Sequence, residues 1–212
     1  MTKKIFLTTG IIIIAVIQIF GQSLTNSPYT RFGIGEIDRS GFNQNKAMGG
    51  IATGLRSTNQ INFLNPAAAS SQDSMSFIFD VGISGISKTL KSQDASLEFQ
   101  NLSFDHLAIS FPIKNWWFAS LGVTPYSKIG YNITQTVPYE FADTINMHYN
   151  YYGNGGINQL FFSNAFDVFN GLSLGFNFNY LFGSLEQYNQ GFLDRQDSNL
   201  TVIADIITMN RE

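Results

Sequence analysis

The chain has 212 residues, no cysteine and a formal net charge of −3, so it offers no disulfide framework, no cysteine-based metal site and no basic surface for nucleic acid. Charged residues make up 13% of the chain, about half the usual share, whereas aromatic residues reach 15%. The mean hydropathy is nevertheless +0.00, far from that of a helical membrane protein. This combination favours β-strands that have one apolar face and one polar face.

The N-terminus has the order of an export signal. Two lysines precede an apolar run at residues 5–20, and Gly21 then provides a small residue for cleavage. A membrane anchor helix is the alternative, but the uninterrupted apolar core covers only residues 10–17, well short of the roughly 20 that a spanning helix needs. We therefore predict that residues 1–21 are a cleaved secretory signal peptide.

The mature chain divides into two parts. Residues 22–74 are rich in Gly, Asn, Ser and Ala and show no sustained periodicity, so they predict a compact irregular segment held by scattered apolar side chains. From residue 75 onward, apolar and polar side chains alternate with a period of two. We predict that residues 75–212 form transmembrane β-strands.

The clearest strand covers residues 172–182, where the even-numbered positions are all large and apolar and most odd-numbered positions are small and polar. Because strand side chains alternate between faces, this segment has one apolar face. Its length suits a tilted transmembrane strand of about 9–11 residues. Three segments alternate in the same way: residues 77–84, 106–113 and 117–124. A fifth strand is predicted at residues 157–169, but Asn164 falls among its apolar positions and its faces stay unassigned.

Alternation alone also suits a soluble β-sandwich. Three features favour a membrane: the apolar faces are aromatic, the opposite faces are small and polar, and Trp116 and Trp117 stand beside a turn, where an interfacial aromatic belt belongs. The connections support this interpretation, because short turns at residues 114–115 and 170–171 alternate with long polar segments. The long segments are residues 87–97, 127–156 and 186–199, of which the second is expected to contain strand extensions and to end in a glycine-rich turn at residues 153–156.

Five strands, and a sixth near Thr201, are fewer than the eight or more that bacterial barrels use. An open sheet would also expose unpaired backbone groups to lipid. We therefore expect the chain to be the N-terminal part of a larger antiparallel β-barrel. The alternative is that other protomers supply the remaining strands.

Three tracts are similar to the FadL/TodX family of outer-membrane transporters, in the form found in Bacteroidota. They are Ser-Pro-Tyr-Thr-Arg-Phe-Gly-Ile-Gly at residues 27–35, Ala-Met-Gly-Gly at residues 47–50 and Asn-Gln-Ile-Asn-Phe-Leu-Asn-Pro-Ala at residues 59–67. The resemblance implies a fourteen-stranded barrel whose segment 22–74 folds into the lumen as a hatch. The hatch motif would then consist of Asn65, Pro66, Ala67, Gly49 and Gly50. The triplet at residues 65–67 also suits a stiff turn with no gating role.

The same resemblance implies passive transport of hydrophobic small molecules, either long-chain fatty acids or aromatic hydrocarbons, across the outer membrane of a Gram-negative cell. Outer-membrane lipid and the hydrophobic ligand would then be the partners. The alternative is a non-transporting barrel that scaffolds or plugs a partner such as the type IX secretion machinery. No cofactor and no enzymatic activity are expected.

The chain contains only two histidines, His106 and His148. A metal site with Asp105 or Asp143 is conceivable, but lone histidines are usually structural, and we expect no metal or catalytic site. Asp80 lies on a predicted inward face. We expect it to face water in preference to an arginine of segment 22–74.

Overall fold

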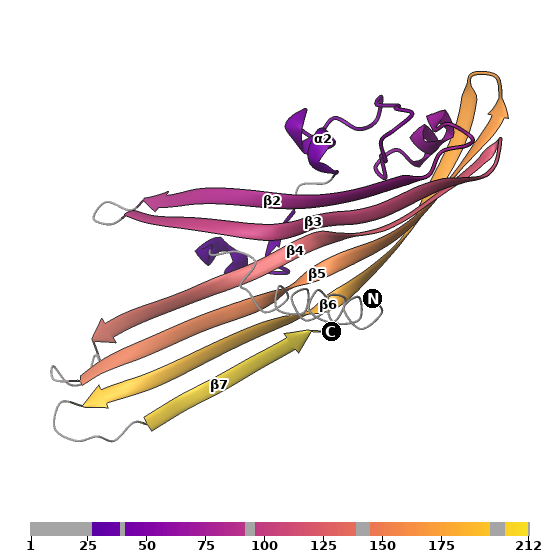
Figure 1. The fold of residues 1–212 in the computed structure, drawn as a ribbon. Helices are drawn as coiled ribbons and strands as arrows, with labels where there is room; N and C mark the ends of the chain where they lie inside the picture. The colour runs from indigo at the N-terminus through magenta and orange to yellow at the C-terminus, as the bar shows by residue number, and fades with distance from the viewer. Residues whose placement is uncertain (1–26, 39–40, 92–95, 139–144, 196–201, 212) are drawn as a thin grey trace, which may run out of the picture.

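A computed structural model describes residues 27–38, 41–91, 96–138, 145–195 and 202–211. Its main element is an antiparallel sheet in which six strands follow one another in chain order (Figure 1). These strands are β2 (Ile78–Lys91), β3 (Ser96–Lys114), β4 (Trp117–Pro138), β5 (Ile145–Phe169), β6 (Leu172–Arg195) and β7 (Val202–Arg211). The sheet is not closed, because within these residues β2 pairs only with β3, and β7 only with β6. The all-β prediction is confirmed, whereas barrel closure and strand number stay predictions.

The predicted signal peptide, residues 1–21, lies outside the described residues. The described part of the chain before the sheet, here called the N-terminal segment, lies against one face of the sheet (Figure 1). Its elements are η1 (Pro28–Arg31), β1 (Glu36–Ile37), α2 (Asn43–Ala47) and η2 (Pro66–Ser71). None of the helices in the described ranges is long and apolar enough to cross a membrane.

The face that carries the N-terminal segment, here called the inner face, has the small polar side chains that the alternation predicts. The hydroxyl of Ser120 donates to Ser110 at 2.9 Å, and Ser110 donates to Gln72 of the segment at 2.6 Å. An apolar core fills the space beside these contacts. It consists of Phe42, Ile61 and Phe63 from the segment and Ala108 and Phe161 from the sheet. The N-terminal segment and the sheet therefore share one core.

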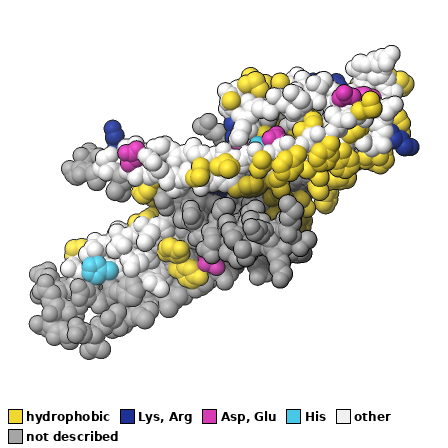
Figure 2. Space-filling view, viewed as in Figure 1, with side chains coloured by type: hydrophobic (Ala, Val, Ile, Leu, Met, Phe, Trp, Pro, Cys, Tyr) yellow, Lys and Arg dark blue, Asp and Glu magenta, His cyan; other side chains and the backbone are white. Residues whose placement is uncertain are grey.

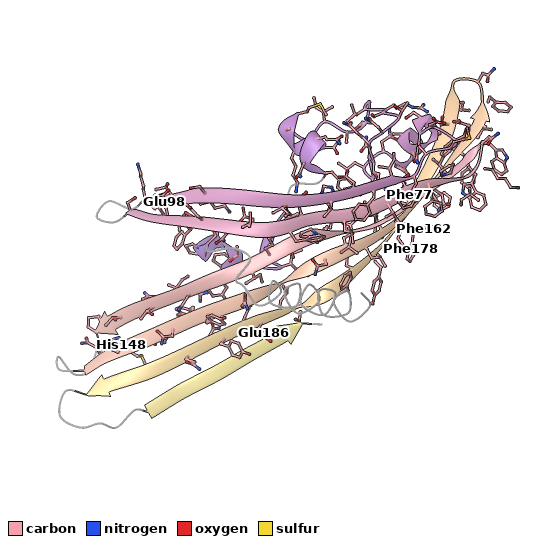
Figure 3. All side chains as sticks on the ribbon, viewed as in Figure 1. Phe77, Glu98, His148, Phe162, Phe178 and Glu186 are labelled. Carbon is pink, nitrogen blue, oxygen red and sulfur yellow. The ribbon has the colours of Figure 1, made fainter. Side chains whose placement is uncertain are left out.

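The opposite face, here called the outer face, is apolar and uncovered. Phe77, just before β2, and Phe79, Val81 and Ile83 on β2 are each more than half exposed, as the alternation predicts. Figure 2 shows hydrophobic side chains gathered along one half of the sheet, and Figure 3 places Phe77, Phe162 and Phe178 together on that half.

The long segments between predicted strands are largely strand, which confirms the expected extensions. β4 pairs with β5 from Trp117 opposite Phe166 to Pro138 opposite Asn146, with one register shift between Pro125 and Ser127. The predicted glycine turn at residues 153–156 is wrong, because these residues pair with both neighbours inside β5. Gly153 is needed there for space: a Cβ would lie 2.5 Å from Cζ of Tyr131 on β4. The short connection at residues 170–171 is confirmed, with Gly171 at a φ of 89°.

Candidate functional site

A β-bulge in β3 creates the most highly charged buried site among the described residues. Gly82 of β2 lies opposite His106 and Ile83 lies opposite Phe104, which leaves Asp105 without a partner position. A bulge puts two consecutive residues opposite one and redirects their side chains. Asp105 and His106 are therefore both buried on the inner side, with exposed fractions of 0% and 1%.

His106 lies between two carboxylates. Its Nδ1 is 2.8 Å from Asp105 Oδ2, and its Nε2 is 3.2 Å from Asp80 Oδ1. Its ring stacks on Phe42 of the N-terminal segment at a centroid distance of 3.8 Å. Gly82 makes room for this ring, because a Cβ there would lie 2.5 Å from Nδ1. Asp80, which we expect to face water in preference to an arginine, keeps 25% of its side chain exposed, and its carboxylate also faces the imidazole.

Two lysines complete the charge arrangement. Lys46 of α2 contacts Asp105 and lies 3.7 Å from Asp38, the residue after β1. Lys128 of β4 lies 2.9 Å from Asp38 and donates to Ser103 of β3 at 3.3 Å. We call Asp38, Lys46, Asp80, Asp105, His106 and Lys128 the seam cluster. It joins β2, β3 and β4 to the N-terminal segment through buried ion pairs.

The seam cluster holds charges in place and contains no nucleophile–base pair. Taking charges out of water costs several kcal/mol per ion unless partners surround them, so loss of one member leaves an uncompensated charge. No group of three or more His, Asp or Glu side chains that could hold a metal ion occurs among the described residues. The ion pairs of the seam cluster therefore hold the N-terminal segment against the sheet.

The motif at residues 65–67 makes a second attachment. Gly175 of β6 lies directly beneath it, and a Cβ there would lie 2.7 Å from the Pro66 carbonyl carbon and 2.8 Å from Ala67 Cα. The side-chain amide of Asn65 donates to the Thr53 carbonyl at 2.7 Å, which stiffens the turn. The structure thus places the triplet against the inner face, where its predicted gating role stays a prediction.

Gly49 and Gly50 make the turn that follows α2. Both have a positive φ, 75° and 90°, and a Cβ at either would meet no atom within 4 Å. The backbone N–H of Gly50 donates to the Asn45 carbonyl at 2.6 Å, which ends the helix. Their conformation explains these glycines, and no described contact links them to the triplet at residues 65–67.

A third attachment lies farther along the strands. The guanidinium of Arg31 lies 3.7 Å from the ring centroid of Tyr151, which is close enough for a cation–π contact. Ile34 packs beside it against buried Ile129, Tyr131 and Leu185.

The outer face carries an aromatic group at the short-turn end of the strands. The indole N–H of Trp117 donates to Asn164 Oδ1 at 2.9 Å, which assigns Asn164 to the outer face and satisfies its buried amide oxygen. Trp116, Trp117, Phe166 and Phe176 form successive ring pairs with centroids about 6 Å apart. Lys114 lies 5.4 Å from the Trp116 ring. Tryptophans beside a cation are typical of a membrane–water interface.

The alternation at residues 106–113 predicts His106 on the polar face, whereas no sequence pattern indicates Lys46, Lys128 or Asp38. Lys128 lies in the long polar segment at residues 127–156, and nothing in the sequence marks the bulge. The one sequence feature that could have indicated these residues is the scarcity of charge, because each charge that is buried in such a chain needs a partner.

These features define an all-β protein with an open antiparallel sheet, an aromatic exposed face and a polar face attached to an N-terminal segment by buried charges. A family model described as BamG matches residues 1–206, and the chain belongs to the BamG family. Membership places the protein at the outer membrane of a Gram-negative cell, as expected. No curated protein and no solved structure matches the chain.

The family assignment corrects the predicted relationship to FadL/TodX. The tracts at residues 27–35, 47–50 and 59–67 are short and rich in turn-forming residues, and four of their glycines have a positive φ in the structure. Local turn chemistry therefore accounts for them without that ancestry. The prediction of passive transport of a hydrophobic ligand depended on that relationship, so it is wrong as well. The alternative partner, the type IX secretion machinery, has no support.

Proposed function

We propose that this protein is a non-enzymatic outer-membrane component that associates with the BAM complex. The observation that carries the proposal is the match of the BamG family model to residues 1–206, nearly the whole chain. The absence of an enzymatic activity is part of the proposal and rests on the sequence, which shows no catalytic set.

The outer face supports the membrane part of this proposal. On β6, residues from Leu174 to Phe182 present large exposed side chains, including Phe176 at 55% and Phe178 at 66%. Nine residues of strand suit a tilted crossing of a bilayer. Exposed apolar patches of this kind mark protein or membrane contacts, and the tryptophans at one end favour lipid.

We infer that these strands attach the protein to the membrane. The 212 residues contain no cysteine, the residue whose thiol carries the lipid of a bacterial lipoprotein. Export by cleavage after Gly21 is the route that the sequence predicts. Mass spectrometry of the mature N-terminus tests this, since Gln22 is expected as the first residue.

Co-purification tests the proposed function. A tagged chain is purified from detergent-solubilised outer membranes, and the BAM subunits are quantified against a tagged outer-membrane protein of similar abundance. Because any newly made outer-membrane protein contacts the machinery briefly, the measurement is repeated after translation has been blocked. If the chain is a component of the BAM complex, it is expected to retain the BAM subunits after the block. If it is only a substrate of the complex, it is expected to lose them. Absence of these subunits from both samples would overturn the proposal.

A further inference from the structure

β5 and β6 continue far beyond the length that a bilayer needs. β5 has 25 residues and β6 has 24, whereas about 9–11 tilted residues cross the hydrocarbon layer. Within the described part of β6, the exposed large apolar side chains end at Phe182. The short turn at residues 170–171 lies at the opposite end of these strands, and in outer-membrane barrels such turns face the periplasm. On the proposed membrane placement, the halves of β5 and β6 beyond Phe182 therefore project outside the cell.

The polarity of the two faces reverses at this point. Leu185 is buried on the inner face, where it packs in an apolar cluster with residues of β4. Its neighbours Ser184 and Glu186 lie on the outer face and are exposed. Because side chains alternate along a strand, a face that is apolar up to Phe182 becomes polar from Ser184 onward. On the same placement, this change marks the level at which the outer face leaves the hydrocarbon layer.

The outer face beyond this level carries two tyrosines among hydroxyl and amide groups. Tyr152 of β5 lies opposite Tyr188 of β6, and their ring centroids are 6.1 Å apart. Tyr152 is 42% exposed. In the adjacent row, Asn150 of β5 lies between Thr134 of β4 and Gln190 of β6. We call the following residues the tyrosine patch: Asn132, Thr134, Asn150, Tyr152, Tyr188 and Gln190.

The tyrosine patch and its surroundings carry almost no charge. The outer-face positions within residues 130–136, 146–156 and 184–190 include no lysine or arginine, and Glu186 is their only acidic residue. Figure 3 shows His148 and Glu186, which border the patch, on the far half of the strands from Phe162 and Phe178. A phosphate-binding surface would need cations. Hydroxyl and amide groups both donate and accept hydrogen bonds, and a tyrosine ring offers an apolar face, so the patch suits a neutral ligand rich in hydroxyl groups.

The height of the patch above the hydrocarbon layer indicates which ligand lies there. Tyr188 follows Phe182 by six residues. Six residues extend ~20 Å along a strand and ~14 Å along the membrane normal at a tilt of ~45°. The polar layer of a phospholipid leaflet extends only ~5–8 Å beyond the hydrocarbon. The lipopolysaccharide of an outer leaflet has a saccharide head group that extends farther, so this saccharide is the neighbour of the outer face at the height of Tyr188.

We propose that the tyrosine patch binds the core saccharide of lipopolysaccharide in the outer leaflet. Sugar rings present C–H groups that pack on the rings of Tyr152 and Tyr188, and sugar hydroxyls hydrogen-bond to the amides of the adjacent row. Because the patch continues the apolar outer face, one lipopolysaccharide molecule can contact this face with both its acyl chains and its head group. The proposal rests on the outer-membrane placement in the proposed function and not on association with the BAM complex.

Photo-crosslinking tests the position of the saccharide. p-Benzoylphenylalanine replaces Tyr152 in the protein reconstituted in phosphatidylethanolamine vesicles that contain either lipopolysaccharide with its core saccharide or lipid A alone. Gln135 is the matched control position, since it is exposed on the inner face of β4 at a similar height. We expect several-fold more crosslink to lipopolysaccharide from position 152 than from position 135, and little crosslink from position 152 to lipid A. Equal yields at the two positions, or with the two lipids, would overturn the proposal.

Substitution tests whether the tyrosines hold the saccharide. The double variant Tyr152→Ser/Tyr188→Ser is expected to retain several-fold fewer lipopolysaccharide molecules than the unmodified protein after purification in detergent, as counted by native mass spectrometry. Tyr152→Phe/Tyr188→Phe keeps the rings and is expected to retain most of them. Tyr149→Ser is the matched control, since Tyr149 lies on the inner face of β5, and it is expected to cause no loss.

Three results would overturn the proposal: equal retention by the serine double variant and the unmodified protein, equal loss from Tyr149→Ser, or a crosslink from position 152 to a protein in place of lipopolysaccharide in native outer membranes. The reconstituted vesicles contain no BAM subunits, so failure of the proposal is distinct from failure of the co-purification test.

Discussion

The ammonium nitrogen of Lys128 on β4 lies 2.9 Å from a carboxylate oxygen of Asp38, and only 6% of Lys128 is exposed. The pair joins the sheet to the residue that follows β1. Lys46 reaches the same carboxylate and also contacts Asp105 on β3. The seam cluster therefore holds β3, β4 and the N-terminal segment together where β3 and β4 stop pairing.

Lys128→Met is expected to lower the free energy of unfolding by about 2 kcal/mol, because Asp38 loses a cation that lies 2.9 Å away in a largely buried site. Thermal unfolding of the protein in detergent measures the change. Lys91→Met is the control, since Lys91 is exposed at the end of β2 and should change the stability by less than about 0.5 kcal/mol. In a double-mutant cycle, Asp38→Asn should recover part of the loss, and strict additivity would contradict the ion pair.

Gly175→Ala is expected to displace the triplet at residues 65–67 from β6. Its new Cβ would lie 2.7 Å from the carbonyl carbon of Pro66, a backbone atom that cannot turn aside, and overpacking of this kind costs about 1–3 kcal/mol. Limited proteolysis should then cut the N-terminal segment sooner. Gly85→Ala is the matched strand control, since its Cβ would meet only Leu102 Cδ1, at 3.9 Å. Equal protection of both variants would show that the close contact is absent.

Trp117→Phe is expected to leave the buried amide oxygen of Asn164 without a donor, at a cost of about 1–3 kcal/mol. Adding Asn164→Val removes the unsatisfied group and should recover much of that loss. Urea unfolding in lipid vesicles compares the single and double variants. A double variant no more stable than Trp117→Phe would rule out this hydrogen bond as the reason for a polar residue on the outer face.

Phe178→Lys and Asn179→Lys place the same charge on opposite faces of β6. A lysine near the centre of a bilayer costs a transmembrane strand about 2–4 kcal/mol, whereas the inner face already carries polar groups. We expect the folded, membrane-inserted fraction to fall for Phe178→Lys and to stay near that of the unmodified protein for Asn179→Lys. Fractionation of outer membranes measures it, and equal losses would argue against lipid on the outer face.

The parts of the fold that depend on local alternation could be predicted. The four faces around Phe79, Ile109, Leu121 and Phe178 follow from a period of two, and the turn at Gly171 follows from its need for a positive φ. The strand lengths could not be predicted, because polar β4 and β5 residues pair across the sheet without an apolar stripe. The seam cluster depends on a bulge and on ion pairs between residues distant in the chain, and neither can be predicted from local sequence patterns.

In the N-terminal tracts, the sequence was assigned more functional meaning than it carries. Residues 27–35 and 59–67 resemble tracts of a transporter family, but their composition follows from the conformation that the backbone adopts there. Gly35 has a φ of 88° where the segment runs against β4, and the turn at Asn65 is stiffened by its own amide. Such requirements recur in unrelated chains, so the tracts indicate a conformation and not a function.

Fluorescence quenching by lipids that carry a quencher at a known depth tests directly whether the outer face of the sheet contacts lipid. A single environment-sensitive label is attached at Phe178→Cys or at Asn179→Cys in the protein reconstituted in bilayers. If the outer face contacts lipid, quenchers near the bilayer centre are expected to quench a label at position 178 strongly and one at position 179 little. Quenching at position 178 only by a water-soluble agent would contradict that contact.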